Sequence, residues 1–172
     1  VYLLRSIDPY LCLLTPMPRL CKALLKVLLF IWTEGPDPAS DTFNLRGHAF
    51  IKLRQVCLKL PGSYTEEVFR SMYLSFARTS KSFTEMSAPS VLFMTRCLIE
   101  LFKVDLPQTY QQGFLYIRQL ALHLRTVILK KNSDNMKLIT SWQFMNCLRL
   151  WTRVLCAMPA SDELGALAFP LS

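Results

Sequence analysis

The chain has 172 residues, of which 52% are apolar and 19% are charged, and its formal net charge is +8. This composition excludes intrinsic disorder as the main state, because the apolar content is sufficient to form a core. With only five glycines, the chain is poorly suited to an all-β fold that needs many tight turns. The mean hydropathy of +0.26 is high, but a membrane span needs roughly 20 consecutive apolar residues. The best stretch, residues 23–32, is ten long and contains Lys26, so we expect no membrane span.

The cysteine spacing argues against a structural zinc site. No two of the six cysteines are closer than nine residues, so the chain has no Cys-x-x-Cys pair. A chain of this length can build its core without disulfides. We therefore expect reduced cysteines that pack as small apolar residues in an intracellular protein. The chain begins with Val1 rather than methionine, and we expect it to be a fragment of a longer protein.

Proline and glycine divide the first third of the chain into helices. Pro16 and Pro18 predict the end of one apolar helix and the start of a second, which runs to about residue 33. The sequence Gly-Pro-Asp-Pro at 35–38 predicts a loop. A third helix is expected from about residue 42 to residue 60, ending at the Pro-Gly pair that follows.

Capping signals and apolar periodicity predict the remaining helices. Ser63 or Thr65 is expected to cap the next helix, with two glutamates in its first turn. Ser87 is expected to cap another that ends before Pro107. A long helix over 108–131 is predicted from apolar residues at steps of four, three, four, three and four: Tyr110, Phe114, Ile117, Ala121, Leu124 and Ile128. The last long helix is expected from about Leu138 to the residue before Pro159.

The predicted helices group into three consecutive pairs, about 18–60, 65–106 and 108–158. The pairs begin 47 and 43 residues apart, which matches the period of roughly 40–47 residues in HEAT and armadillo repeats. We therefore expect an all-α fold, a HEAT/armadillo-like solenoid in which residues 1–172 form one helical-repeat region. The alternative is a plain helical bundle. The wide apolar faces favour stacked repeats.

No arrangement typical of a catalytic or metal site occurs in the sequence. Nucleophile elbows, Gly-rich phosphate loops and zinc-binding His-Glu-x-x-His motifs are all missing. His48 and His123 lie 75 residues apart, and His123 is expected to be a partly buried, hydrogen-bonded side chain. We therefore expect no enzyme, no cofactor, no metal and no small-molecule substrate.

Most of the positive charge lies in one helical pair. Residues 108–156 contain seven basic residues and one acidic residue, Asp134. This surface is expected to bind RNA or another polyanion through phosphate contacts, and its members are Arg118, Arg125, Lys130, Lys131, Arg149 and Arg153. Two alternatives remain: a solvated outer face, or contact with an acidic protein segment. Trp142 and Trp151 are expected to lie in the core or between helices, and not to stack on bases.

Several segments resemble the nucleolar complex protein 2 family. The most specific are YQQGFLYIRQLALHLR at 110–125 and SWQFMNCLRLWTRVL at 141–155. Weaker similarity is found at 68–76, 93–94, 98–101 and 167–171, so the resemblance covers most of the chain. One departure is Asn146, where the family pattern has histidine.

The resemblance implies a non-enzymatic, helical-repeat assembly factor in the nucleus and nucleolus. Members of the family pair with nucleolar complex protein 1 or 3 and act in the maturation and nuclear export of the large ribosomal subunit precursor. The expected partners are therefore a protein of that type, other preribosomal proteins and rRNA. Animal members are also linked to chromatin, so the alternative function is a corepressor module that inhibits histone acetylation.

Overall fold

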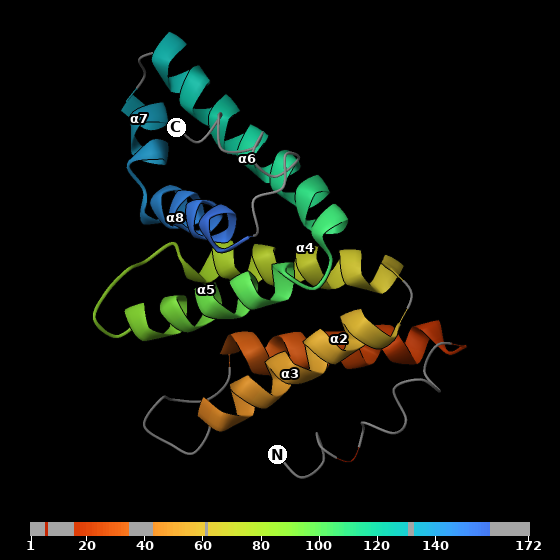
Figure 1. Ribbon diagram of the computed structural model, residues 1–172. Helices are drawn as coiled ribbons and strands as arrows, with labels where there is room; N and C mark the ends of the chain where they lie inside the picture. Colours follow the sequence, from red (N-terminus) through yellow and green to blue (C-terminus); the bar gives the residue numbers. More distant parts are fainter. Residues whose placement is uncertain (1–5, 7–15, 35–42, 61, 131–132, 159–172) are drawn as a thin grey trace. The chain divides into compact units, whose positions relative to one another are not determined.

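The structure is helical throughout the part of the chain that it describes. The computed structural model describes residue 6 and residues 16–34, 43–60, 62–130 and 133–158, among which there is no strand. Figure 1 shows the helices in chain order: α2 (Pro18–Glu34), α3 (Phe43–Lys59), α4 (Gly62–Thr79), α5 (Ala88–Phe102), α6 (Leu106–Leu129), α7 (Ser133–Ile139) and α8 (Trp142–Ala157). The all-α prediction is confirmed for these residues. None of the described helices combines the length and apolar character needed to cross a membrane.

The chain divides into two compact units, residues 1–75 and 76–172, with the boundary inside α4. Each unit is described by itself. The expected single repeat region over 1–172 stays a prediction, and the helix predicted before Pro16 lies outside the described residues.

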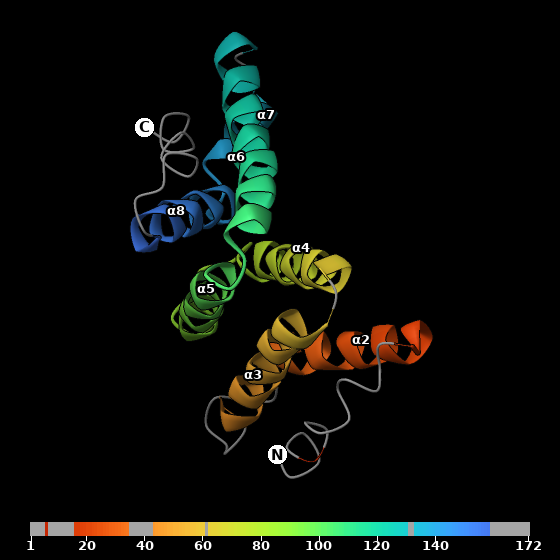
Figure 2. The same ribbon diagram turned by 45° about the vertical axis from the view of Figure 1, so that its right-hand side comes forward.

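In the first unit, α2 packs against α3 (Figure 2). Apolar residues at steps of four, three and four place one face of α2 in the core, and its buried members are Cys21, Leu25, Leu28 and Trp32. The matching residues of α3 are Ala49, Leu53 and Val56, all fully buried. Burying a large apolar side chain contributes about 1.5–3 kcal/mol, which makes this face the main stabilising feature of the pair.

Two side chains bond to helix ends that would otherwise leave carbonyl groups without partners. The Nε of Arg46 donates a hydrogen bond of 2.8 Å to the Trp32 carbonyl near the C-terminal end of α2. A cation at this end also interacts favourably with the helix dipole. The hydroxyl of Thr65 donates to the Cys57 carbonyl, 3.3 Å away, in the last turn of α3. Ser63 and Thr65 both lie inside α4, so the prediction that one of them caps this helix is wrong. The helix begins at Gly62, so its two glutamates also lie beyond the first turn.

In the second unit, Trp151 joins three helices. Its ring stacks on Phe102 of α5, with centroids 5.3 Å apart, and on Tyr116 of α6, with centroids 6.2 Å apart. Trp151 itself belongs to α8 and is 1% exposed. Stacked aromatic pairs contribute about 0.5–1.5 kcal/mol beyond the area that they bury. For Trp151, the prediction of a place in the core or between helices is confirmed.

Short polar contacts fix the turns between these helices. Asp105 caps α6 by accepting a 3.0 Å hydrogen bond from the Gln108 amide, and the Thr109 hydroxyl donates to the Phe102 carbonyl at 2.6 Å. Ser141 caps α8 by accepting from the Phe144 amide at 3.2 Å. This cap separates α7 from α8, so the prediction of one continuous helix from Leu138 is wrong.

The segment after α4 holds the start of α8. The Asn146 amide, 5% exposed, donates to the Ser80 carbonyl at 3.3 Å, and the ring of Trp142 lies 5.3 Å from that of Phe83. Trp142 is 48% exposed, so it is a partly exposed contact and not a core residue. A histidine N–H at position 146 could also donate, so asparagine preserves the donor that such a contact needs.

The described cysteines support the expectation of reduced core thiols. Cys21, Cys57, Cys97 and Cys147 are free and buried, whereas Cys156 is free and exposed. Burial raises the pKa of the Cys21 thiol, a hydrogen bond with Tyr64 lowers it, and the carboxylate of Glu67 raises it, with burial the largest effect. The pKa of Tyr64 is also raised, chiefly by desolvation.

We predict that Trp151→Ala lowers the free energy of unfolding by about 3–5 kcal/mol, because it opens a cavity where α5, α6 and α8 meet. Trp142→Ala is the matched control, because about half of that ring is already in solvent. Urea unfolding followed by circular dichroism measures both. Equal losses in the two variants would contradict the central role of Trp151.

We also predict that the first unit becomes less stable as the pH rises above 9. The folded-state pKa of Cys21 is raised above its ordinary value of 9.0, so its contribution is complete below that value and is lost as the thiolate forms. Cys21→Ala should reduce this pH dependence, while Cys156→Ala should leave it unchanged. Hydrogen exchange of α2 and α3 between pH 7 and pH 10, corrected for the intrinsic exchange rate, gives the comparison.

Candidate polyanion-binding surface

The structure places the predicted basic residues on the exterior of the second unit. Arg118 and Arg125 are exposed on α6, and Arg149 and Arg153 are exposed on α8. Lys130, which directly follows α6, is also exposed. Lys131 lies outside the described residues.

The arginines of α6 point away from the core. At about 100° per residue, Arg118 and Arg125 lie on nearly the same side of the helix, about 10.5 Å apart along its axis. The buried residues of α6 lie on the opposite side, and they are Thr109, Gln112, Gly113, Tyr116, Ile117, Leu120 and Val127. This side also contacts α8 through Tyr116.

The arginines of α8 also lie opposite the buried side of their own helix. Arg149 and Arg153 are one turn apart, whereas Leu150, Trp151 and Val154 are buried. Each pair therefore forms a strip that faces solvent. That the two strips act together as one polyanion surface stays a prediction.

The charges around these strips have one sign. Among the described side chains of residues 106–158 none is acidic. Asp105, which directly precedes α6, is engaged in capping that helix. A surface on which basic side chains predominate attracts polyanions.

The exposed side of α6 is also unexpectedly apolar. Of the six residues predicted to form its buried stripe, only Ile117 is buried, while Phe114 is 48% and Ile128 is 64% exposed. The buried stripe is displaced by one residue toward the N-terminus, a rotation of about 100°. We call the five residues of this stripe that are not buried the α6 apolar face: Phe114, Leu124 and Ile128 are exposed, and Tyr110 and Ala121 are half-buried.

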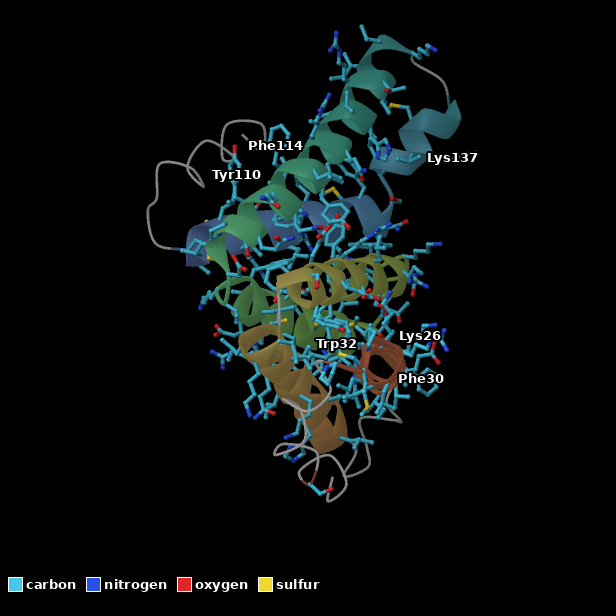
Figure 3. The ribbon with its side chains drawn as sticks, turned by 90° about the vertical axis from the view of Figure 1, so that its right-hand side faces the viewer. Lys26, Phe30, Trp32, Tyr110, Phe114 and Lys137 are labelled. Atoms are coloured by element: carbon cyan, nitrogen blue, oxygen red, sulfur yellow. The ribbon has the colours of Figure 1, made fainter. Side chains whose placement is uncertain are left out.

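Figure 3 shows the rings of Tyr110 and Phe114 pointing from the same side of α6. Their centroids are 6.3 Å apart. Arg118 and Arg125 lie beside this face on the helix surface. The apolar spacing of the sequence identifies this stripe but does not distinguish a buried face from an exposed one.

No catalytic arrangement is evident in the described parts of the chain. His123 is exposed, so its prediction as partly buried is wrong, and His48 is half-buried. No group of three or more histidine, cysteine or acidic residues within the described residues could hold a metal. A hollow of about 490 Å³ between α2 and α4 is lined by Lys22, Arg70, Glu66 and Glu67, together with two serines and Leu74. Its lining contains no histidine and no cysteine.

Comparison with known proteins supports the resemblance. Nucleolar complex protein 2 of Drosophila melanogaster is 35% identical over 98% of this chain. Nucleolar complex-associated protein 2 of Arabidopsis thaliana is 29% identical over 99% of it. The nucleolar complex protein 2 homolog of Caenorhabditis elegans is 30% identical over 89% of it. These names agree with the expected nuclear and nucleolar location.

The chain spans 21%, 22% and 21% of the lengths of these three relatives. The model of the Noc2p family matches residues 63–172, which include α4 to α8 and all six predicted surface residues. Since this match covers more than half of its residues, the chain belongs to the Noc2p family.

Proposed function

We propose that the protein containing this chain is a non-enzymatic assembly factor of the large ribosomal subunit precursor. It acts in the nucleolus as a complex with a related protein, of the nucleolar complex protein 1 or 3 type, and accompanies the precursor through maturation and nuclear export. The observation that carries the proposal is the outer side of α6, where exposed apolar residues lie beside two arginines. This combination suits a protein that binds other macromolecules.

The α6 apolar face supports the pairing with another protein. Single exposed apolar residues are common, but several on one helix face mark interaction sites. Phe114 and Ile128 are each about half or more exposed, and they lie on the same side of the helix as Tyr110. A partner that covers this face would remove these side chains from water.

The arginine strips support contact with rRNA. Arginine suits phosphate because its planar guanidinium donates two parallel hydrogen bonds to one group. The four arginines are exposed on their helices, so their guanidinium groups are accessible to a polyanion. The proposed RNA surface comprises Arg118, Arg125, Lys130, Lys131, Arg149 and Arg153.

The proposal includes stacking of the helices as a HEAT/armadillo-like solenoid. The helix bounds support three consecutive pairs, in which α2 is followed by α3, α4 by α5, and α6 by α8 after the short α7. A solenoid would present such exposed faces to several partners along its length.

Changing Arg118, Arg125, Arg149 and Arg153 to glutamate in the full-length protein should release it from the large-subunit precursor at lower salt. Losing four phosphate contacts should reduce the slope of log affinity against log salt by about 3. Co-sedimentation in sucrose gradients of graded salt measures this. A matched variant reverses four exposed charges elsewhere, namely Arg54, Lys59, Lys81 and Arg96. Equal behaviour of both variants and wild type would contradict RNA contact, and co-sedimentation with nucleosomes instead would favour the corepressor function.

Phe114→Ser combined with Ile128→Ser should weaken pairing with the related nucleolar complex protein by at least tenfold, because both side chains lose an apolar partner surface. Leu58→Ser is the control, because the Leu58 side chain of α3 is also exposed. Affinity measured between purified full-length proteins gives the result. If the double variant pairs as tightly as the control, the α6 apolar face is not the pairing surface.

A further inference from the structure

Helix α2 carries a second apolar stripe that the described residues of its own unit do not cover. Leu20, Val27 and Phe30 are 52%, 55% and 63% exposed, and Ala23 between them is also exposed. We call these four residues the α2 outer stripe. Their steps of three, four and three place them on one side of the helix. The face that packs on α3 is centred about 140° away around the axis.

Figure 3 shows this division of α2 directly. The Trp32 side chain points toward the core of its unit, while Phe30 and Lys26 point away from it. Trp32 is fully buried and Phe30 is among the most exposed large apolar residues of the described chain. Helix α2 is therefore apolar on two sides, and only one of them is buried within the described residues of the first unit.

A basic edge borders the α2 outer stripe. Arg19, Lys22 and Lys26 are exposed and follow each other at steps of three and four, so they form a second line beside the stripe. The only acidic residue of α2 is Glu34, at the last position of the helix. The side chains that α2 itself contributes to this edge are therefore all positive, and one of them, Lys22, also lines the hollow that contains Glu66 and Glu67 of α4.

We infer that the α2 outer stripe and its basic edge bind an amphipathic helix of another polypeptide, with carboxylates along the edge that faces Arg19, Lys22 and Lys26. The stripe extends over ten residue steps, about 15 Å, which corresponds to the three turns that such a helix uses for its apolar anchors. Acidic residues on the incoming helix would supply opposite charges to this edge, above all to Arg19 and Lys26, which do not line the hollow with Glu66 and Glu67.

Other occupants fit these observations less well. A second copy of α2 would bring three further arginine and lysine side chains to the edge and a single carboxylate, that of Glu34 at the end of the helix, so most of the cations would stay without an opposite charge. RNA would satisfy the cations but would leave Leu20, Val27 and Phe30 without an apolar partner. The inference concerns the first unit, and it does not depend on the proposed ribosomal function or on the arginine strips.

The test places a photo-crosslinking amino acid at position 30 of the full-length protein in its native cells, with position 58 on α3 as the matched exposed control. Mass spectrometry then identifies the crosslinked segment. The expected product, specific to position 30, is a segment of a different protein with apolar residues at helical spacing and aspartate or glutamate beside them. No position-specific product, or a product with RNA, with a second copy or with the same chain, would overturn the inference.

The crosslinked segment, synthesised as a peptide, then tests the chemistry. Lys22→Glu with Lys26→Glu should weaken its binding to the full-length protein roughly tenfold, and a peptide with lysine in place of its acidic residues should bind this variant better than it binds wild type. Recovery through the charge swap shows that the variant is folded. If the protein with Lys22→Glu and Lys26→Glu bound the original peptide as tightly as wild type, the inferred role of the basic edge would be wrong. If Phe30→Ser left the affinity for that peptide unchanged, the inferred role of the apolar stripe would be wrong.

Discussion

The stacking of Trp151 between Phe102 and Tyr116 determines the orientation of the helices in the second unit. Because these rings come from α5, α6 and α8, their contact fixes which side of each helix is buried. Once Tyr116 faces Trp151, the outer side of α6 carries Phe114, Ile128 and its two arginines. The candidate surface is thus a consequence of the core: the same rotation that buries Tyr116 presents the basic and apolar residues to partners.

The sequence predicted helix locations better than helix orientation. Proline and glycine marked the bounds of α2 and α3 closely, because each residue acts locally on the backbone. The buried side of α6 lies one residue away from the side that the apolar spacing predicts. The polar residues Thr109 and Gln112 are buried there, whereas the apolar Tyr110 and Phe114 are not. The bond from Thr109 to the Phe102 carbonyl satisfies its hydroxyl, and periodicity does not reveal such tertiary contacts. The same limit applies to Asn146, whose partner Ser80 lies 66 residues away.

A large core does not account for all of the high apolar content of the chain. Part of it lies on the α6 apolar face, about 100° around the helix from the buried side, and on the α2 outer stripe, about 140° from the buried side of that helix. Both are bordered by arginine or lysine, so they combine an apolar contact with a positive edge. A protein that assembles with others gains from such surfaces, since the hydrophobic contribution is made on binding and the charges restrict which partners fit.

Hydroxyl-radical footprinting of the full-length protein, free and bound in its preribosomal complex, tests most directly whether the outer side of α6 is a binding surface. We expect Phe114 and Ile128 to react readily in the free protein and to become protected in the complex, while Tyr116 and Trp151 stay unreactive in both. If Phe114 and Ile128 were as unreactive as Tyr116 in the free protein, the orientation of α6 would be wrong. If they stayed reactive in the complex, the outer side of α6 would not be a binding surface.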